Sequence, residues 1–478
     1  MFLLLILVLA PALTACLLLF FAPPERACWR LALATSILVA VGALRLLAEP
    51  RPRLLFDYRF TPIVSLAFVM DAVGLLFSLV ASCLWFFTII YSHGYMKHEG
   101  RIRSYLAFLI LSLGITNGIA LAGNLVTLFF FYEALTLSTF PLVIHRRTPE
   151  AMRAGIVYLA YNLIGATLVL LAIATLAGRV HKVDFIYGGI IPPGLFTRAE
   201  LVRLVVLFVA GFGVKAAVIP LHHWLPRAMV APTPVSALLH AVAVVNAGVF
   251  GLLRVSAYVL GRETLNAFNL APLLRWPMVV TIILGSIWAF RQDDLKRRLA
   301  YSTISQLAYM GLGASFLTSG GWTAALLHFF NHALLKITLF FCAGNLAVGS
   351  GKTKVSELLG VGFHQPWTMG AFAVASLGMI GLPPANGFLS KWYLGLGALE
   401  AGKPGFLAVV LISALLNAGY FLPILFAAFR SRPTSPPSLS EPPLTMLVPT
   451  LVLALSCLVF FFWPHLPLHL SSWSEGGA

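Results

Sequence analysis

Apolar stretches about as long as a bilayer is thick recur along almost the whole chain. A transmembrane helix needs about 20 mostly apolar residues, and fourteen stretches qualify: 2–22, 28–48, 68–92, 104–121, 123–145, 155–178, 201–229, 235–260, 273–291, 299–317, 322–348, 366–398, 405–430 and 443–464. Of the 478 residues only 10% are charged, against about 25% in soluble proteins. We therefore expect an all-α polytopic membrane protein with about fourteen transmembrane helices.

The segments between these stretches are short. The most polar of them, 45–62, 179–203 and 430–445, are expected to be loops. The first apolar run, 1–22, has no basic leading region and no clear cleavage site, so we expect a retained helix rather than a signal peptide. The five cysteines are scattered and form no CxxC motif, which argues against disulfide, zinc and iron–sulfur frameworks.

The net charge is +16, and most of the basic residues lie in the predicted loops. In a soluble domain it would raise the question of nucleic-acid binding, but here the basic residues set topology, and we expect no nucleic-acid partner. Lys and Arg are more frequent in the loops opposite the termini. We therefore expect a multi-pass protein of the bacterial inner (plasma) membrane with both termini on the periplasmic, outer side.

Two of the stretches are too long and contain prolines. Residues 201–229 include Pro220, and 366–398 include Pro383 and Pro384. A proline frees the carbonyl four residues earlier, and such a carbonyl is tolerated at membrane depth only inside protein or beside water. The carbonyls expected to be freed are those of Ala216, Met379 and Ile380.

Interrupted helices at matching places in two halves are typical of transporters built on inverted repeats. The interruptions fall in helix 7 of a unit of helices 4–8 (104–260) and in helix 12 of a unit of helices 9–13 (273–430). We expect one membrane domain, 1–478, in which helices 1–3 (1–103) precede these units and helix 14 (443–464) follows them.

Four ionisable side chains lie deep inside predicted helices: Glu133, Lys215, Lys336 and Lys391. Each costs about 2.5–3.5 kcal/mol to insert, so each should face the protein interior and have a partner. A static ion pair that fixes helix packing is one interpretation. Because these four, together with His240, His328 and His332, are spread over helices 5, 7, 8, 11 and 12, we favour ion translocation.

Lys215 lies one turn before Pro220, and Glu133 has no neutralising neighbour in its own sequence. We expect the two to form an ion pair across helices 5 and 7. A closed pair favours the protonated lysine, whereas an open pair leaves a buried lysine that favours proton release.

Three titratable residues of helix 11, His328, His332 and Lys336, recur every four positions and share one face. Each step rises about 6 Å, so a relay along this face needs intervening water. Two histidines four residues apart also suit a metal, but no carboxylate or cysteine accompanies them. We expect neither a metal nor a cofactor.

Residues near helix ends allow two interpretations. His222 and His223 follow the Pro220 break, where they either cap freed carbonyls or gate proton entry. Asp71 opens the third helix, where an interfacial cap is the simpler role.

Four stretches resemble the antiporter-like subunits shared by respiratory complex I, membrane-bound hydrogenases and Mrp-type sodium/proton antiporters. They are 215–240 (KAAVIPLHHWLPRAMVAPTPVSALLH), 294–307 (DLKRRLAYSTISQL), 332–336 (HALLK) and 381–391 (GLPPANGFLSK). The resemblance covers roughly residues 60–430. The stretches 91–97 (YSHGYMK) and 132–141 (YEALTLSTFP) lean toward the D-like branch of the Mrp proteins.

The resemblance implies fourteen helices, two inverted five-helix units with broken helices 7 and 12, and a charged axis along the midplane. The residues matched by motif position are Glu133 on helix 5, Lys215 on helix 7, His328, His332 and Lys336 on helix 11, and Lys391 on helix 12.

The chain departs from this family on helix 8, where the usual lysine is replaced by Asn246. Asparagine binds water but cannot hold the proton. In a continuous helix, His240 lies about 9 Å from Asn246 along the axis and titrates near neutral pH, so we expect it to pass protons between the halves through water. The plain alternative is an axis interrupted at helix 8.

The sequence therefore predicts a proton-translocating subunit, with or without sodium exchange, of a multi-subunit membrane complex. Two alternatives stay open: a proton-pumping subunit of a complex I-like or hydrogenase redox complex, and a membrane scaffold for a vectorial CO₂-hydration enzyme. No cofactor motif or hydrolase triad is found, so we expect no redox or hydrolytic site in the chain itself. The expected partners are other membrane subunits, the lipid bilayer and the transported ions.

Overall fold

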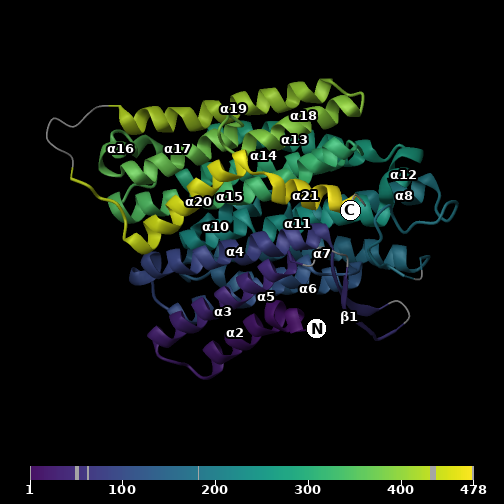
Figure 1. Cartoon of the computed structure of the whole chain (residues 1–478), viewed down its shortest axis with the longest axis horizontal. Coiled ribbons are helices and arrows are strands. Elements are labelled where there is room, and N and C mark those ends of the chain that lie inside the picture. Colours follow the sequence, from purple (N-terminus) through teal and green to yellow (C-terminus); the bar gives the residue numbers. More distant parts are fainter. Residues whose placement is uncertain (1, 49–52, 62–63, 181, 431–437, 476–478) are drawn as a thin grey trace.

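The structure, a computed structural model, describes residues 2–48, 53–61, 64–180, 182–430 and 438–475. The helices run along a common direction and form one bundle (Figure 1). Within the described residues, ten helical spans are long and apolar enough to cross a membrane. They are α3 (Glu25–Leu46), α4 (Ala72–Tyr95), α5 (Ile102–Ala120), α6 (Leu125–Val143), α7 (Pro149–Ala177), the segment Thr233–Ala267, α13 (Ala271–Phe290), α15 (Ser319–Ser350), α19 (Gly405–Phe429) and α20 (Leu444–Phe462).

The other four predicted stretches are also helical. α8 (Arg198–Lys215) and α14 (Leu295–Ala314) each carry more than two charged residues, which lowers their hydropathy. The stretch 366–398 is divided into α17 (Pro366–Ile380) and α18 (Gly387–Glu400). The first stretch is divided into α1 (Phe2–Leu4), a π-helical segment (Leu5–Leu9) and α2 (Ala10–Phe20). A mostly helical, multi-pass membrane protein is thus confirmed.

Both interruptions predicted from proline are present. α8 ends at Lys215, and an irregular turn leads to the short α9 (Trp224–Arg227). α17 ends at Ile380, and α18 begins only at Gly387.

A third interruption contradicts the prediction of a continuous helix over 235–260. The span consists of α10 (Thr233–Ala241), α11 (Val244–Arg254), a π-helical segment (Val255–Leu260) and α12 (Gly261–Ala267). Neither proline nor glycine lies between α10 and α11, so no local signal marks the break. His240 and Asn246 therefore lie on different helical segments, and their separation along one continuous helix does not apply.

The predicted loop 45–62 is in part a hairpin. β1 (Arg53–Arg59) pairs antiparallel with β2 (Ser65–Met70), so that Arg53 lies opposite Met70. β2 also bonds to the turn between α5 and α6, where the amide of Val69 donates to the carbonyl of Leu121 at 2.8 Å. The hairpin therefore ties the start of α4 to the α5–α6 connection. Part of the predicted loop 430–445 (431–437) lies outside the described residues.

The remaining elements are short. α16 (Val361–His364) and three 3-10 turns (Met96–His98, Ala228–Val230 and Val355–Glu357) lie in connections. α21 (His465–Ser474) was not predicted and packs against α15 and α4. Both termini lie toward the same side of the bundle, on the right of Figure 1.

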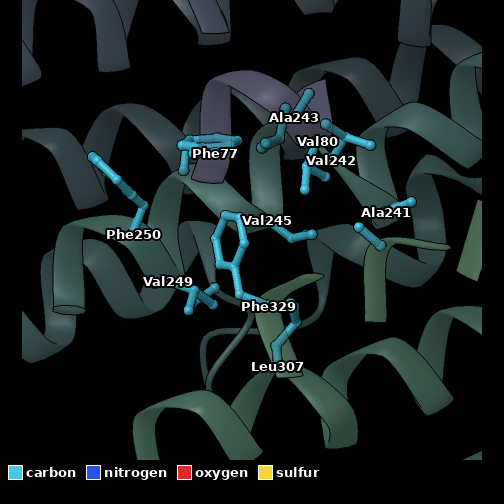
Figure 2. Close-up of a cluster of buried hydrophobic side chains, with 14 of the residues drawn as sticks. Phe77, Val80, Ala241, Val242, Ala243, Val245, Val249, Phe250, Leu307 and Phe329 are labelled. Atoms are coloured by element: carbon cyan, nitrogen blue, oxygen red, sulfur yellow. The ribbon is translucent and has the colours of Figure 1, made fainter. Parts of the chain in front are cut away.

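The third interruption lies in the middle of the apolar core. Figure 2 shows side chains from α4, α11, α14 and α15 packed around it. The ring of Phe77 on α4 lies 5.1 Å from the rings of both Phe250 and Phe329. The 18 most apolar consecutive residues of Thr233–Ala267 are all buried inside the protein. The broken backbone is therefore enclosed by protein and does not face lipid. This is needed because lipid offers no hydrogen-bond partner to free backbone groups.

Gly248 allows α11 to approach the end of α8. A methyl group at this position would lie 2.3 Å from the backbone nitrogen of Ala216 and 2.8 Å from the carbonyl carbon of Lys215. We predict that Gly248→Ala lowers the free energy of unfolding by about 1–3 kcal/mol, because the two backbones must move apart. Unfolding of the purified protein in detergent measures the change.

The matched control is Gly370→Ala in α17, where an added methyl group meets no atom within 4 Å. Equal stability of the two variants would contradict the packing argument.

Candidate functional site

Lys215, the last residue of α8, is completely buried. Its ammonium group donates a hydrogen bond to the carbonyl oxygen of Tyr132 in α6 and lies 3.4 Å from the centre of the Tyr132 ring. A carbonyl dipole and an aromatic face both stabilise a cation taken out of water. The residue is thus held by neutral groups.

The direct ion pair expected between Glu133 and Lys215 is not formed. One carboxylate oxygen of Glu133 is buried and bonds to no residue in the described ranges. Successive residues of a helix point about 100° apart, and the carbonyl of Tyr132 holds the lysine instead. The two charges interact electrostatically at longer range, so a movement of the Glu133 side chain is needed to close the pair.

The turn after Lys215 has its own donor. The indole of Trp224 donates to the carbonyl of Val214, the residue before Lys215, at 2.7 Å. His222 is 1% exposed and its ring stacks on Trp288 with 4.8 Å between centres, whereas His223 is exposed. Trp224 thus caps the carbonyl of Val214 and not that of Ala216, the carbonyl that we expected Pro220 to free. The two roles considered for His222 and His223, capping and gating of proton entry, stay predictions.

The third interruption is held by Asn246. Its side-chain amide donates to the carbonyl of Ala241 at 2.8 Å, and its amide oxygen bonds to no described residue. His240, at the end of α10, is completely buried, and both ring nitrogens lack a partner among the described residues. Its ring lies 5.0 Å from that of Phe340.

The three titratable residues of α15 are all buried. The rings of His328 and His332 lie 6.0 Å apart. The Nδ1 atom of His328 is 2.9 Å from the hydroxyl of Ser390 in α18, and both nitrogens of His332 lack a partner within the described part of the chain. Lys336 donates to the hydroxyl of Ser302 in α14 at 2.7 Å.

Lys391 binds the carbonyls expected to be freed by Pro383 and Pro384. Its ammonium group donates to Met379 at 2.6 Å and to Ile380 at 2.9 Å. The lysine thus lies at the C-terminal end of α17, where the helix dipole favours a cation. The prediction that the carbonyls of Met379 and Ile380 are free of helical hydrogen bonds at this break is confirmed.

A hydrogen-bonded chain that the sequence did not indicate joins Lys336 to Lys391. The hydroxyl of Tyr420 in α19 bonds to Ser302 at 2.9 Å and to the amide oxygen of Asn417. The amide nitrogen of Asn417 donates to the carbonyl of Met379 at 3.1 Å, the same carbonyl that Lys391 binds. Polar residues of the otherwise apolar α19 were the available signal.

Two further buried residues were missed on α14. The side-chain amide of Gln306 and the hydroxyl of Tyr309 form no hydrogen bond of normal geometry with the described residues, although Ser413 lies next to Tyr309, and the Tyr309 ring stacks on His328 at 5.2 Å. More than about nine in ten buried polar groups have a partner in folded proteins, and buried water supplies partners where several such groups converge. The unpaired atoms of α10, α14 and α15 are therefore the groups to which buried water would bond.

A second charged site lies at one end of α4. The side chain of Asp71 accepts from the amide of Gly74 at 2.8 Å, so the predicted cap is present. Asp71 also forms a two-point ion pair with Arg254 of α11, which is 1% exposed. Three rings surround the guanidinium group within 5.1 Å: those of Phe185, Phe250 and Tyr258. Sequence reasoning did not single out Arg254, although an arginine inside the predicted helix 235–260 was the available signal.

The sequence and the fold match known proteins. The model of the family described as NADH:quinone oxidoreductase/Mrp antiporter, TM, matches residues 122–417. The N subunit of the NADH-quinone oxidoreductase of Desulforudis audaxviator is 36% identical over 74% of this chain and 73% of that protein. The A/B subunit of a probable K(+)/H(+) antiporter of Rhizobium meliloti is 32% identical over 82% of this chain, but only 39% of that protein is covered. For the A1 subunit of a Na(+)/H(+) antiporter of Staphylococcus haemolyticus the identity is 29%, and the covered shares are 83% and 52%.

Two solved structures have the same fold. One is the membrane-bound sulfane sulfur reductase, an archaeal respiratory membrane complex (TM-score 0.89), and the other is the Mrp complex of Dietzia sp. DQ12-45-1b (TM-score 0.86). Each is 22% identical in sequence, with 99% of this chain and 96% of the compared chain covered. The lean toward the D-like Mrp branch stays a prediction, since these relatives carry other names.

Asp71→Asn removes the counter-charge of Arg254 while keeping an oxygen to cap Gly74. We predict that it lowers the free energy of unfolding by about 3–5 kcal/mol, because a buried guanidinium is left uncompensated. The double variant Asp71→Asn/Arg254→Met should regain part of this loss. Denaturant unfolding in detergent measures both.

Asp57→Asn is the control, because the partner of Asp57 is the exposed Arg59, 3.3 Å away. Its effect should stay below about 1 kcal/mol. A double variant that is less stable than Asp71→Asn alone would rule out the stranded charge as the cause.

Proposed function

Because the chain belongs to the NADH:quinone oxidoreductase/Mrp antiporter transmembrane family, we propose that it translocates protons, with or without exchange for sodium, as one component of a multi-subunit membrane complex. The observation that supports this most is the row of buried lysines, histidines and unpaired polar atoms in α8, α10, α14, α15 and α18. Burial of so many ionisable groups is costly in a membrane and is typical of ion pathways.

The architecture that we propose has fourteen crossing helices and two inverted five-helix units, 104–260 and 273–430, in one membrane domain. The positions of two helix interruptions support the equivalence of the two units. The first unit contains the interruption after Lys215, and the second unit contains the interruption before Lys391. Both termini lie toward one side of the bundle (Figure 1), which agrees with an even number of crossings, and the distribution of basic loops favours the outer, periplasmic side.

In the first unit, Lys215 is the residue that we propose to gain and lose the proton. Glu133 is near enough to influence it electrostatically but does not hold it. Movement of the carboxylate toward the lysine favours the protonated state, and movement away favours release. The exposed His223 and the buried His222 lie at the turn that follows, where proton entry is proposed.

In the second unit, two routes lead toward Lys391. The histidine face of α15 ends at His328, which contacts Ser390 beside Lys391. The chain through Ser302, Tyr420 and Asn417 starts at Lys336. Hydroxyl groups both donate and accept, so they suit proton transfer, whereas the backbone carbonyl at the end of this chain only holds Lys391 in place.

A redox-driven form of the same function is the second candidate. It is favoured by the relative named as part of an NADH-quinone oxidoreductase, of which 73% is covered. Purification of the native complex decides between the two: co-purifying redox subunits favour the redox form, and small antiporter subunits without redox centres favour ion exchange. A scaffold role beside a CO₂-hydrating enzyme would instead be indicated by a soluble zinc partner.

Lys215→Ala should abolish ion flux while the complex still assembles, because no other ionisable group of the first unit occupies the end of α8. Proton flux into vesicles that contain the whole complex is the measurement. Glu133→Gln should act similarly, since the lysine then lacks its mobile counter-charge. Lys97→Ala, at an exposed lysine, is the control and should keep normal flux. Wild-type flux in Lys215→Ala would refute the proposal.

His240→Ala should stop flux between the two units, because His240 is the titratable group at the third interruption. Asn246→Lys should partly restore flux in that background, since a lysine can hold the proton and can still donate to the carbonyl of Ala241. Asn246→Ala separates the structural role, with an expected loss of about 1–3 kcal/mol of stability for the unpaired carbonyl.

The same vesicle assay gives the opposing outcomes. Unchanged flux in His240→Ala would make the histidine a packing residue. Absence of flux in the wild type, together with flux in Asn246→Lys, would favour the scaffold role.

A further inference from the structure

A groove of about 880 Å³ lies on the outside of the bundle, where the start of α3, the end of α4 and the start of α20 meet. In Figure 1 these three helix ends lie on the left. Helix ends of a membrane bundle lie near the lipid headgroups, so one end of the groove is interfacial and the other is at acyl-chain depth.

The interfacial end is basic and contains unused donors. Arg26 and Arg30 are exposed and form neither a hydrogen bond nor an ion pair with any residue in the described ranges. The hydroxyl of Thr445 is buried and bonds to none of the described residues. Among the described lining residues, the two arginines face a single carboxylate, Glu25. Arg103, at the start of α5, acts electrostatically on the same part of α3.

The deeper end is apolar. Leu33 lies seven residues after Arg26, which is about 10 Å further along α3, and Ile89 and Ile90 line the opposite wall. Between the two ends, the ring of Trp29 contacts that of His93 edge-on with 5.1 Å between centres. Tryptophan is typical of the membrane interface.

We propose that this groove binds one anionic phospholipid, with its phosphate between Arg26 and Arg30 and an acyl chain along Leu33, Ile89 and Ile90. Guanidinium groups bind phosphate oxygens in pairs, and basic pockets between transmembrane helices are suited to anionic headgroups. The site goes beyond the proposed function and does not depend on it. A free phosphate would use only the basic end, and a protein partner would have to cover the whole groove.

The test is lipid binding by the whole detergent-purified complex, measured by native mass spectrometry and by the lipid-induced shift in Tm. The probes are dioleoyl phosphatidylglycerol, dioleoyl phosphatidylcholine and inorganic phosphate. Phosphatidylglycerol should bind the wild type and raise its Tm. In Arg26→Gln/Arg30→Gln its binding should weaken by about tenfold for each arginine lost.

The matched control is Arg153→Gln/Arg227→Gln, which removes the same charge at two exposed arginines outside the groove and should bind like the wild type. Equal weakening in this control, or unchanged binding in the groove variant, would overturn the proposal. Equal binding of phosphatidylcholine would remove the role of headgroup charge, and a Tm shift by inorganic phosphate alone would replace the lipid by a free anion.

Two further measurements cover the remaining outcomes. If the groove variant folds poorly, Arg30→Lys tests the same contact, with weaker binding expected because lysine lacks the paired donors. A photo-crosslinker at Leu33 in native membranes should capture lipid, and capture of a neighbouring protein would overturn the proposal.

Discussion

Every carbonyl that an interrupted transmembrane helix releases must find a donor inside the protein, since lipid offers none. At each of the three breaks this chain supplies such a donor from a side chain. Trp224 binds the carbonyl of Val214, Asn246 that of Ala241, and Lys391 those of Met379 and Ile380. A helix can break only where a donor side chain lies within hydrogen-bonding distance of the freed carbonyl. The surrounding helices enclose these broken ends.

Two of the buried lysines are held by backbone carbonyls rather than by carboxylates, but only Lys391 satisfies a broken helix end. Lys215 binds the carbonyl of Tyr132, and Lys391 binds two carbonyls at the end of α17. A lysine that has lost its proton still carries N–H groups and can still donate to a carbonyl. The end of α17 therefore stays satisfied in both charge states of Lys391. A lysine locked to a carboxylate would instead leave a buried anion behind whenever it released the proton.

The fixed and the changeable charges occupy different places. Arg254 and Asp71 form a two-point ion pair enclosed by aromatic rings, and arginine does not release its proton under biological conditions. This pair therefore stabilises the junction of α4 and α11. The lysines and histidines in the centre lie instead among hydroxyl groups and unpaired polar atoms, where a proton can move.

The sequence by itself determined where the helices lie and where two of them break, because apolar length and proline act locally. It also identified Lys215, Lys336 and Lys391 as deeply buried, since lysines inside apolar runs must turn inward. It could not reveal the break after Ala241, the partner of Lys215, or the chain through Tyr420 and Asn417. Each of these depends on which helix lies opposite, and only the packed bundle brings residues far apart in the sequence within hydrogen-bonding distance.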